Sequence, residues 1–246
     1  MYAFNYIGRY FILLSHVFVR PEKRSIYWKQ IIREIDVLGL DSLGITLIIS
    51  IFVGAVITIQ TASNIDNPLY PTYLVGYASR ESIILEFSPT IVSLILAGKV
   101  GSRIASEIGT MRITEQIDAL EMMGVNSAGY LILPKIIASV FINPFLVIIS
   151  MFISIWGGWV ASVATGLITS TNYIYGIQFG FRPFTVTYAL IKTIVFAFII
   201  TTVSSNEGYY TKGSSLDVGR ASTRAVVYSS IVILLFNLIL TQLLLI

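Results

Sequence analysis

Apolar residues dominate this chain in five long runs, and shorter polar stretches between them hold most of its charged residues. An α-helix rises about 1.5 Å per residue, so runs of about 20 residues can cross the roughly 30 Å hydrocarbon core of a bilayer. The pattern therefore predicts an all-α integral membrane fold with five transmembrane helices. We place them at residues 43–61, 82–104, 136–164, 184–203 and 225–246.

The residues before the first run are amphipathic. An apolar patch at residues 11–18 is too short to span a membrane, and basic residues without a small-residue cleavage pattern follow it, which argues against a cleaved signal peptide. We therefore divide the chain into an N-terminal amphipathic interfacial region, residues 1–40, and a five-helix transmembrane domain, residues 41–246.

A helical pattern also appears just before the first span. Apolar residues between positions 26 and 38 can share one face of a helix, with Tyr27 and Trp28 as interfacial anchors. We expect this helix to lie in the membrane interface. The pattern leaves open whether residues 1–40 form one helix or two. The apolar positions are Tyr27, Ile31, Ile35 and Leu38.

One long polar passage, residues 97–135, separates the second and third spans. Within it Ile113, Ile117 and Leu120 recur at i, i+4 and i+7, which predicts a short amphipathic helix at about residues 111–123. Gly109 would mark a turn before this helix, and Gly124 would be its left-handed C-cap. Such a helix can offer its charged face to a partner protein; the alternative is a solvated loop helix with no partner.

The placement of Lys and Arg predicts the orientation, because basic residues near helix ends are retained in the cytoplasm. Thirteen of them fall in three polar regions, and only Arg80 and Arg182 fall in the two other loops. We expect a cytoplasmic N-terminus and a periplasmic C-terminus. The thirteen are Arg9, Arg20, Lys23, Arg24, Lys29, Arg33, Lys99, Arg103, Arg112, Lys135, Lys212, Arg220 and Arg224.

Composition excludes several classes of function. Hydrophobic residues make up 55% of the chain and charged residues 12%, far from a soluble domain. The chain has no cysteine and one histidine, and its charge of +3 is too small to suggest nucleic acid as a partner. It contains no phosphate-binding loop, no G-x-S-x-G elbow and no H-E-x-x-H pair. We expect no catalysis, no metal and no cofactor in this chain.

Two ionisable residues, Glu86 and Lys192, interrupt the second and fourth spans. Each costs about 2.5 to 3.5 kcal/mol at a helix centre, so each needs a partner or a wet cavity. Both spans run inward, and the two residues lie at similar depths, about 8 and 12 Å from the outer end at helical rise. We expect them to pair or to face one cavity. The alternative is an interfacial or purely structural role, such as locking two helices together.

The segment AGKVGSRIASEIGTMRITEQIDALEMMGV closely resembles the permease subunits of the MlaE/YrbE family, the membrane component of MCE-type ABC lipid transporters. The resemblance implies a homodimer that moves phospholipid or a related lipid between the inner and outer bacterial membranes. It implies as partners a cytoplasmic ABC ATPase that binds ATP and Mg, a periplasmic MCE-domain protein and a small cytoplasmic accessory subunit. It places the chain in the inner membrane, with residues 111–123 as the coupling helix.

The resemblance also assigns roles to residues. Glu86 and Lys192 would flank the lipid path. Many family members carry Arg immediately before this Glu, whereas this chain has Leu85, so Lys192 alone would hold an anionic headgroup. The residues that would couple to the ATPase are Glu107, Gly109, Thr110, Arg112, Glu115, Gln116, Asp118 and Glu121.

Two other functions are consistent with the residues. The first is an ion-coupled secondary transporter that uses Glu86 and Lys192 as a proton-sensitive pair, although five spans without an internal repeat argue against it. The second is a structural membrane scaffold. Only the permease of an ABC transporter requires a separate ATPase.

Overall fold

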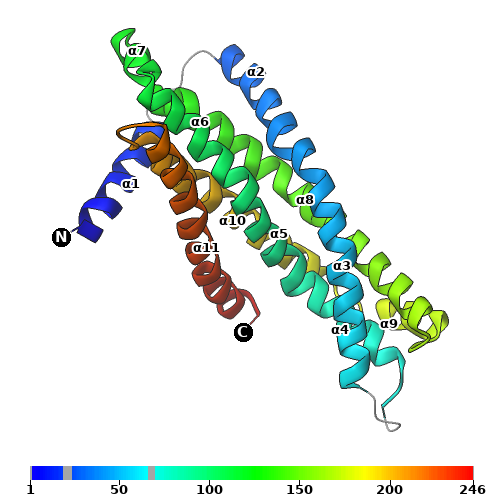
Figure 1. Ribbon diagram of the computed structural model, residues 1–246. Coiled ribbons are helices and arrows are strands. Elements are labelled where there is room, and N and C mark those ends of the chain that lie inside the picture. The colour runs from blue at the N-terminus through cyan, green and yellow to red at the C-terminus, as the bar shows by residue number, and fades with distance from the viewer. Residues whose placement is uncertain (1, 19–23, 66–69, 246) are drawn as a thin grey trace. The chain divides into compact units, whose positions relative to one another are not determined.

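The computed structural model describes residues 2–18, 24–65 and 70–245, and within these ranges the secondary structure is entirely helical (Figure 1). Several segments have the wider π-helical turn and are labelled η. The elements in chain order are α1 (Tyr2–Phe18), α2 (Arg24–Ile35), η1 (Asp36–Leu40), α3 (Asp41–Asn64), α4 (Tyr73–Ser82), η2 (Ile83–Ile91), α5 (Val92–Leu96), η3 (Ala97–Gly101), α6 (Ser102–Ile113), α7 (Gln116–Met122), α8 (Ser127–Thr165), α9 (Ser170–Gln178), α10 (Pro183–Tyr209) and α11 (Ser215–Leu245).

Five helical stretches in the described part of the chain are long and apolar enough to cross a membrane. The all-α, five-span prediction is therefore confirmed. Each stretch extends beyond the apolar run that predicted it, because the helix continues into polar residues at its ends. The stretches are Tyr27–Asn64, Tyr73–Ile113, Ser127–Thr165, Pro183–Tyr209 and Ser215–Leu244.

The N-terminal region forms two helices, α1 and α2. The amphipathic helix expected as a separate element at residues 26–38 is instead continuous with the first span, because η1 joins α2 to α3 without a break. Nothing in residues 36–41 ends a helix: the stretch has no proline, and its one glycine, Gly39, lies buried against Ile142. Gly39 therefore serves close packing here.

The segment between the first two predicted spans is partly helical. Tyr73 and Tyr77 belong to α4, which packs along α9, a helix that the hydrophobic pattern did not predict. Their rings contact Phe179 at centroid distances of 5.1 and 6.2 Å. Residues 66–69 of this segment lie outside the described residues.

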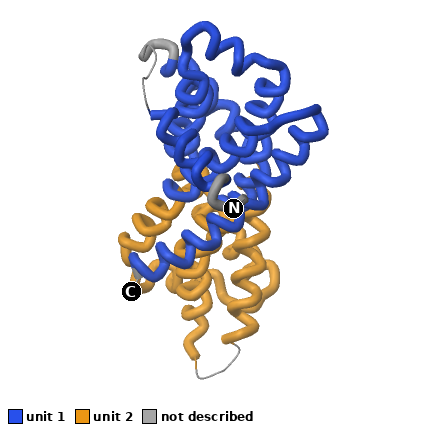
Figure 2. Tube along the Cα trace, turned by 90° about the vertical axis from the view of Figure 1, so that its left-hand side faces the viewer, with its two compact units in different colours: residues 1–42, 93–143, 194–246 blue, residues 43–92, 144–193 orange. Residues whose placement is uncertain are grey.

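Contacts divide the chain into two compact units (Figure 2). Unit 1 comprises residues 1–42, 93–143 and 194–246, and unit 2 comprises residues 43–92 and 144–193. The sequence boundary at residue 40, between an interfacial region and a membrane domain, stays a prediction.

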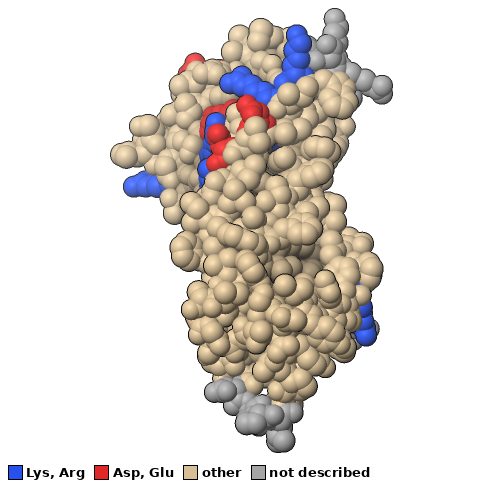
Figure 3. All heavy atoms as spheres, turned by 90° about the vertical axis from the view of Figure 1, so that its right-hand side faces the viewer, with Lys and Arg blue, Asp and Glu red and all other residues tan. Residues whose placement is uncertain are grey.

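Charge is distributed unequally between the units. Among the described Lys and Arg residues, only Arg80, Arg182 and Lys192 belong to unit 2. On the face shown in Figure 3, the acidic atoms and most of the basic atoms gather in one region, one basic group lies apart at the lower right, and a wide area between them carries neither. Arg20 and Lys23, which contributed to the orientation argument, lie outside the described residues.

Candidate functional site

The two ionisable residues of the apolar spans form an ion pair in unit 2. The ammonium of Lys192 on α10 donates to Glu86 Oε1 on η2 at 2.7 Å, which confirms the predicted pairing. Tyr188, one turn before Lys192, donates to the same oxygen at 3.4 Å, and Thr90 donates to Glu86 Oε2 at 3.4 Å. Hydrogen bonds therefore reach both carboxylate oxygens from two helices.

The missing N–H of Pro89 explains why the second span takes the wider π-helical form around Glu86. Pro89 has no N–H to donate to the carbonyl of Leu85, four residues earlier, so a regular α-helix would lose a hydrogen bond here. The helix takes the π form across Ile83–Ile91, and Pro89 lies inside it. The Lys192 ammonium lies 3.5 Å from the Leu85 carbonyl oxygen. Pro89 thus neither starts a helix nor ends one.

Burial is unequal across the intramembrane pair. The Lys192 side chain is fully buried and its ammonium lies 4.5 Å from the centre of the Tyr188 ring, whereas 39% of the Glu86 side chain is exposed. A cation and an aromatic face attract one another strongly when water is excluded. The lysine is therefore held in place by its surroundings, and the carboxylate is the member of the pair that a ligand can reach.

The polar passage after the second span is broken by a turn between α6 and α7, which we call the α6–α7 corner (residues 110–124). The helix predicted at about residues 111–123 is shorter than expected: Met111 to Ile113 end α6, and α7 is Gln116–Met122. The break lies at Glu115, whose φ of 60° is left-handed. It is the only non-glycine residue with positive φ in the described chain, and such a conformation costs about 1–2 kcal/mol.

The end of α7 matches its prediction, but the turn at its start does not. Gly124 has φ +77°, and the Val125 and Gly124 amides donate to the Leu120 and Glu121 carbonyls, which is the Schellman arrangement. Gly109, by contrast, lies inside α6. It is buried against Val218 and Thr211, so its role is close packing with α11 and the segment before it.

The residues assigned to ATPase coupling lie in three environments. Thr110, Glu115, Gln116 and Asp118 are exposed at or beside the corner, with Asp118 bound to Arg112 at 2.7 Å. Glu121 accepts hydrogen bonds from Tyr209 and Ser127, so it ties α7 to the rest of unit 1. Glu107 is bound to Lys135, and Gly109 is buried.

Two exposed methionines at the end of α7 complete this surface. Met122 is 91% exposed and Met123 is 69% exposed, although both are apolar. Methionine is flexible and polarisable, and it is common on surfaces that bind other proteins. The hydrophobic pattern does not predict this exposure, because it assigns the apolar residues of the helix to its membrane side.

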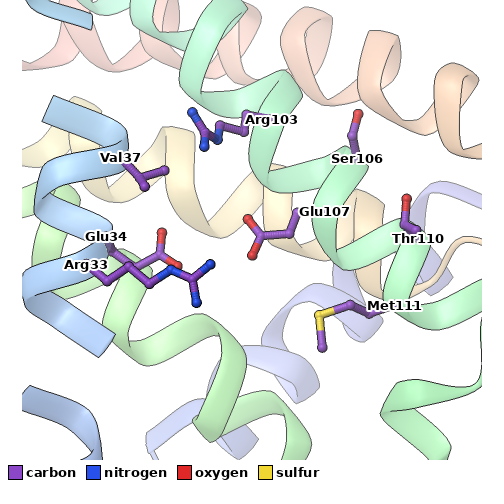
Figure 4. A pocket seen from close by; sticks show the side chains of 8 residues that line it. All are labelled: Arg33, Glu34, Val37, Arg103, Ser106, Glu107, Thr110 and Met111. Carbon is purple, nitrogen blue, oxygen red and sulfur yellow. The ribbon is translucent and has the colours of Figure 1, made fainter. Parts of the chain in front are cut away.

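A charged cleft of about 570 Å³ lies between α2 and α6 in unit 1 (Figure 4). Side chains from the two helices face each other across it, with two arginines and two glutamates among them. It is lined by Arg33, Glu34, Val37, Arg103, Ser106, Glu107, Thr110 and Met111.

Lys135 holds the wall of this cleft together. Its ammonium, on α8, donates to Glu34 on α2 at 2.7 Å and to Glu107 on α6 at 2.8 Å, and only 3% of its side chain is exposed. A buried cation between two carboxylates fixes three helices in register. In the sequence Lys135 lies at the end of the polar passage, and only packing reveals this role.

Arg80 is a second charged residue that is buried, contrary to its prediction from the sequence. It was expected in an outer loop, but it lies in α4 with 1% of its side chain exposed. Its Nη1 donates to the carbonyls of Ile177 and Phe179 at 2.5 and 2.9 Å, and Nη2 pairs with Glu81. Arg80 therefore fastens the end of α9 to α4.

The model of the family described as Permease MlaE matches residues 31–243, almost the whole chain. The chain belongs to the MlaE permease family. It is therefore a multi-pass membrane permease of that family, with the five spans described above.

Related MlaE-family proteins come from distant organisms. A probable ABC transporter permease protein of Rickettsia bellii is 35% identical, over 96% of this chain and 91% of its own. The intermembrane phospholipid transport system permease protein MlaE of Haemophilus influenzae is 31% identical, over 97% and 91%. The chloroplastic protein TRIGALACTOSYLDIACYLGLYCEROL 1 of Arabidopsis thaliana is 32% identical, over 94% of this chain and 66% of its own.

Proposed function

We propose that this chain is the permease subunit of an ATP-driven MCE-type ABC transporter that moves phospholipid or a related lipid between the inner and outer membranes. Its homologue in Haemophilus influenzae is named for phospholipid transport, and that likeness extends over nearly the whole of both chains. The permease works as a homodimer in the inner membrane, with its N-terminus in the cytoplasm. An ATPase that binds ATP and Mg, an MCE-domain protein and a small accessory subunit are its partners.

The observation that carries the proposal is the α6–α7 corner. It combines exposed charge, at Glu115 and Asp118, with two exposed methionines and a strained backbone at Glu115. Strained backbone persists where the surroundings hold it in place, and it is common at functional sites. In our proposal the ATPase binds this corner, and its nucleotide cycle moves α6, which is continuous with the second span and with Glu86.

The intramembrane pair supplies the lipid contact in this proposal. Spans rich in Ile, Leu, Val and Phe suit acyl chains. Lys192 is fixed by Glu86 and Tyr188, and Glu86 is partly exposed. Because Lys192 is fully buried, a headgroup phosphate can reach its ammonium only when Glu86, the exposed member of the pair, moves aside.

Reversing the charge at the corner should separate the permease from its ATPase. In the variant Glu115→Lys with Asp118→Lys, we expect ATPase recovery in co-purification to fall about tenfold or more, because like charges then face the docking surface. The control is Arg220→Glu, which reverses a 74% exposed charge outside the corner. Undiminished recovery with the double reversal would refute docking at this corner.

A second substitution distinguishes the role of the Glu115 backbone in the turn from the role of its carboxylate in ATPase binding. Asparagine tolerates left-handed φ better than glutamate does, so Glu115→Asn should keep the corner and raise stability by about 0.5–1 kcal/mol. If the carboxylate binds the ATPase, co-purification falls while thermal stability rises. If both stay high, Glu115 serves the backbone turn alone, and the docking contact must come from Asp118 and the methionines.

A reconstitution test distinguishes the ion-coupled secondary transporter from the ABC permease. An ion-coupled transporter would move lipid in vesicles that contain this chain alone and carry a proton gradient. We expect no transfer until the ATPase and ATP are added. Transfer by the isolated chain would overturn the ABC proposal and favour the secondary transporter.

A further inference from the structure

A polar pocket and an apolar groove meet on the surface of unit 1, formed by α1, α10 and α11. The polar pocket is lined by Tyr6, Arg9, Asn206, Glu207, Tyr210, Arg224 and Tyr228. The groove, about 540 Å³ in volume, shares Tyr6 and Tyr228 with the pocket and is otherwise lined by aliphatic and aromatic side chains and Tyr10. A charged pocket that opens onto an apolar groove suits an amphiphilic ligand with a charged headgroup and an apolar chain.

Two guanidinium groups at the pocket keep free hydrogen-bonding capacity. Arg9 is exposed and lies 5.7 Å from the Tyr210 ring centre, and it has no carboxylate partner among the described residues. Arg224 uses only its Nε to bind Glu207, at 2.9 Å, and its side chain is 51% exposed. Guanidinium forks bind phosphate oxygens two at a time.

The acidic residue of the pocket is already neutralised. Glu207 is 5% exposed, and it accepts hydrogen bonds from Arg224 and from the Tyr6 hydroxyl. Burial, reinforced by the Glu207 carboxylate, raises the pKa of Tyr6, so this hydroxyl keeps its proton and remains a donor. Arg9 therefore leaves the pocket with one net positive charge.

A buried polar atom also lacks a partner here. Asn206 Oδ1 is buried without a hydrogen bond in the described part of the chain, and Asn206 lines the polar pocket. A buried acceptor without a donor costs about 1–3 kcal/mol. A ligand with a hydroxyl or ammonium group beside its phosphate would supply that donor.

The length of the groove fits one leaflet of a bilayer. Its lining runs along α10 from Val203 to Val195 and along α11 from Tyr228 to Phe236. From Glu207 to Val195 is twelve residues, about 18 Å of helix, against about 15 Å for half of the hydrocarbon core. A second apolar groove shares Val195 and Phe198 with the first and has room for a second acyl chain. It is lined by Ile136, Ile137, Val140, Phe141, Ile194, Val195 and Phe198.

We infer that this surface is a binding site for a membrane glycerophospholipid, with its phosphate between Arg9 and Arg224 and one acyl chain in the groove beside Phe198 and Ile231. It shares no residue with the Glu86–Lys192 pair. Under the orientation in the proposed function, the lipid belongs to the cytoplasmic leaflet, and only that placement depends on the proposed function.

The test uses the full chain in vesicles of phosphatidylethanolamine that contain phosphatidylglycerol with a photoreactive diazirine in one acyl chain. After illumination, mass spectrometry should find the label on peptides containing residues 195–203 or 228–236. Arg9→Ala should reduce this labelling about tenfold, the effect of losing one charge-assisted contact. Arg220→Ala, which removes an exposed arginine of α11, the helix that carries Arg224, should leave it unchanged.

A second variant blocks the groove without touching the charges. Ile231 is 51% exposed and lines the groove, so Ile231→Trp should fill it and abolish labelling while the protein stays folded and monodisperse. Equal labelling of the wild type and Arg9→Ala, or labelling confined to other peptides, would overturn the inference. So would cross-links showing that a second copy of the chain covers this surface. Lipid transfer is measured separately, so a transporting protein without this label would refute only the site.

Discussion

Replacing Lys192 with methionine is expected to reduce ATP-dependent lipid transfer at least tenfold and to lower the free energy of unfolding by about 3 kcal/mol. The substitution keeps the volume of the side chain but leaves Glu86 without its ammonium partner. The loss of stability lies at the low end for a broken buried pair, because 39% of the Glu86 side chain is exposed. Transfer is measured between reconstituted vesicles, and stability by thermal unfolding of the purified protein.

The double variant Glu86→Gln with Lys192→Met separates transport from stability. It removes both charges, so no buried charge lacks a partner, and stability should return to within about 1 kcal/mol of the wild type. Transfer should stay low if the lysine holds the headgroup. Recovery of transfer together with stability would show that the pair only locks η2 to α10.

Gly54→Ala is expected to be the most destabilising single methyl addition in unit 2. A Cβ at Gly54 on α3 would lie 1.8 Å from the backbone carbonyl oxygen of Ser154 on α8. Backbone cannot move aside as a flexible side chain does, so the two helices must separate. We expect a loss of about 3 kcal/mol or more and a fall in Tm of about 10 °C.

Gly44→Ala is the matched control on the same helix. A Cβ at Gly44 would meet no atom within 4 Å, so alanine adds helix propensity without a clash. Its Tm should stay level or rise slightly. If the two alanine variants unfold at the same temperature, α3 and α8 are not in backbone contact at Gly54.

Gly44 and Gly54 show how far helix contacts can be predicted from the sequence. Both lie in the first apolar run, where a glycine permits close helix approach, but only Gly54 is in close contact with a neighbouring helix. The same holds for Gly98 and Gly101: the first meets nothing, whereas the second lies against Ser204. A glycine in an apolar run permits contact, but the neighbouring helix decides where contact occurs.

The sequence by itself determined the features that depend on local chemistry and length. The five apolar runs predicted the five spans, because bilayer thickness sets the length of a spanning helix. The cost of charge in the membrane predicted the pairing of Glu86 with Lys192. Left-handed backbone favours glycine, which placed the end of α7 at Gly124.

Only the tertiary structure decided how residues distant in sequence meet. Arg80 and Lys135 read as loop charges, yet both are buried, because carbonyls or carboxylates from other helices surround them. Arg9 and Arg224 come together only when α1 packs beside α10 and α11. A hydrophobic pattern records which face of a helix is apolar; it does not record which helix will cover it, because that depends on packing over the whole unit.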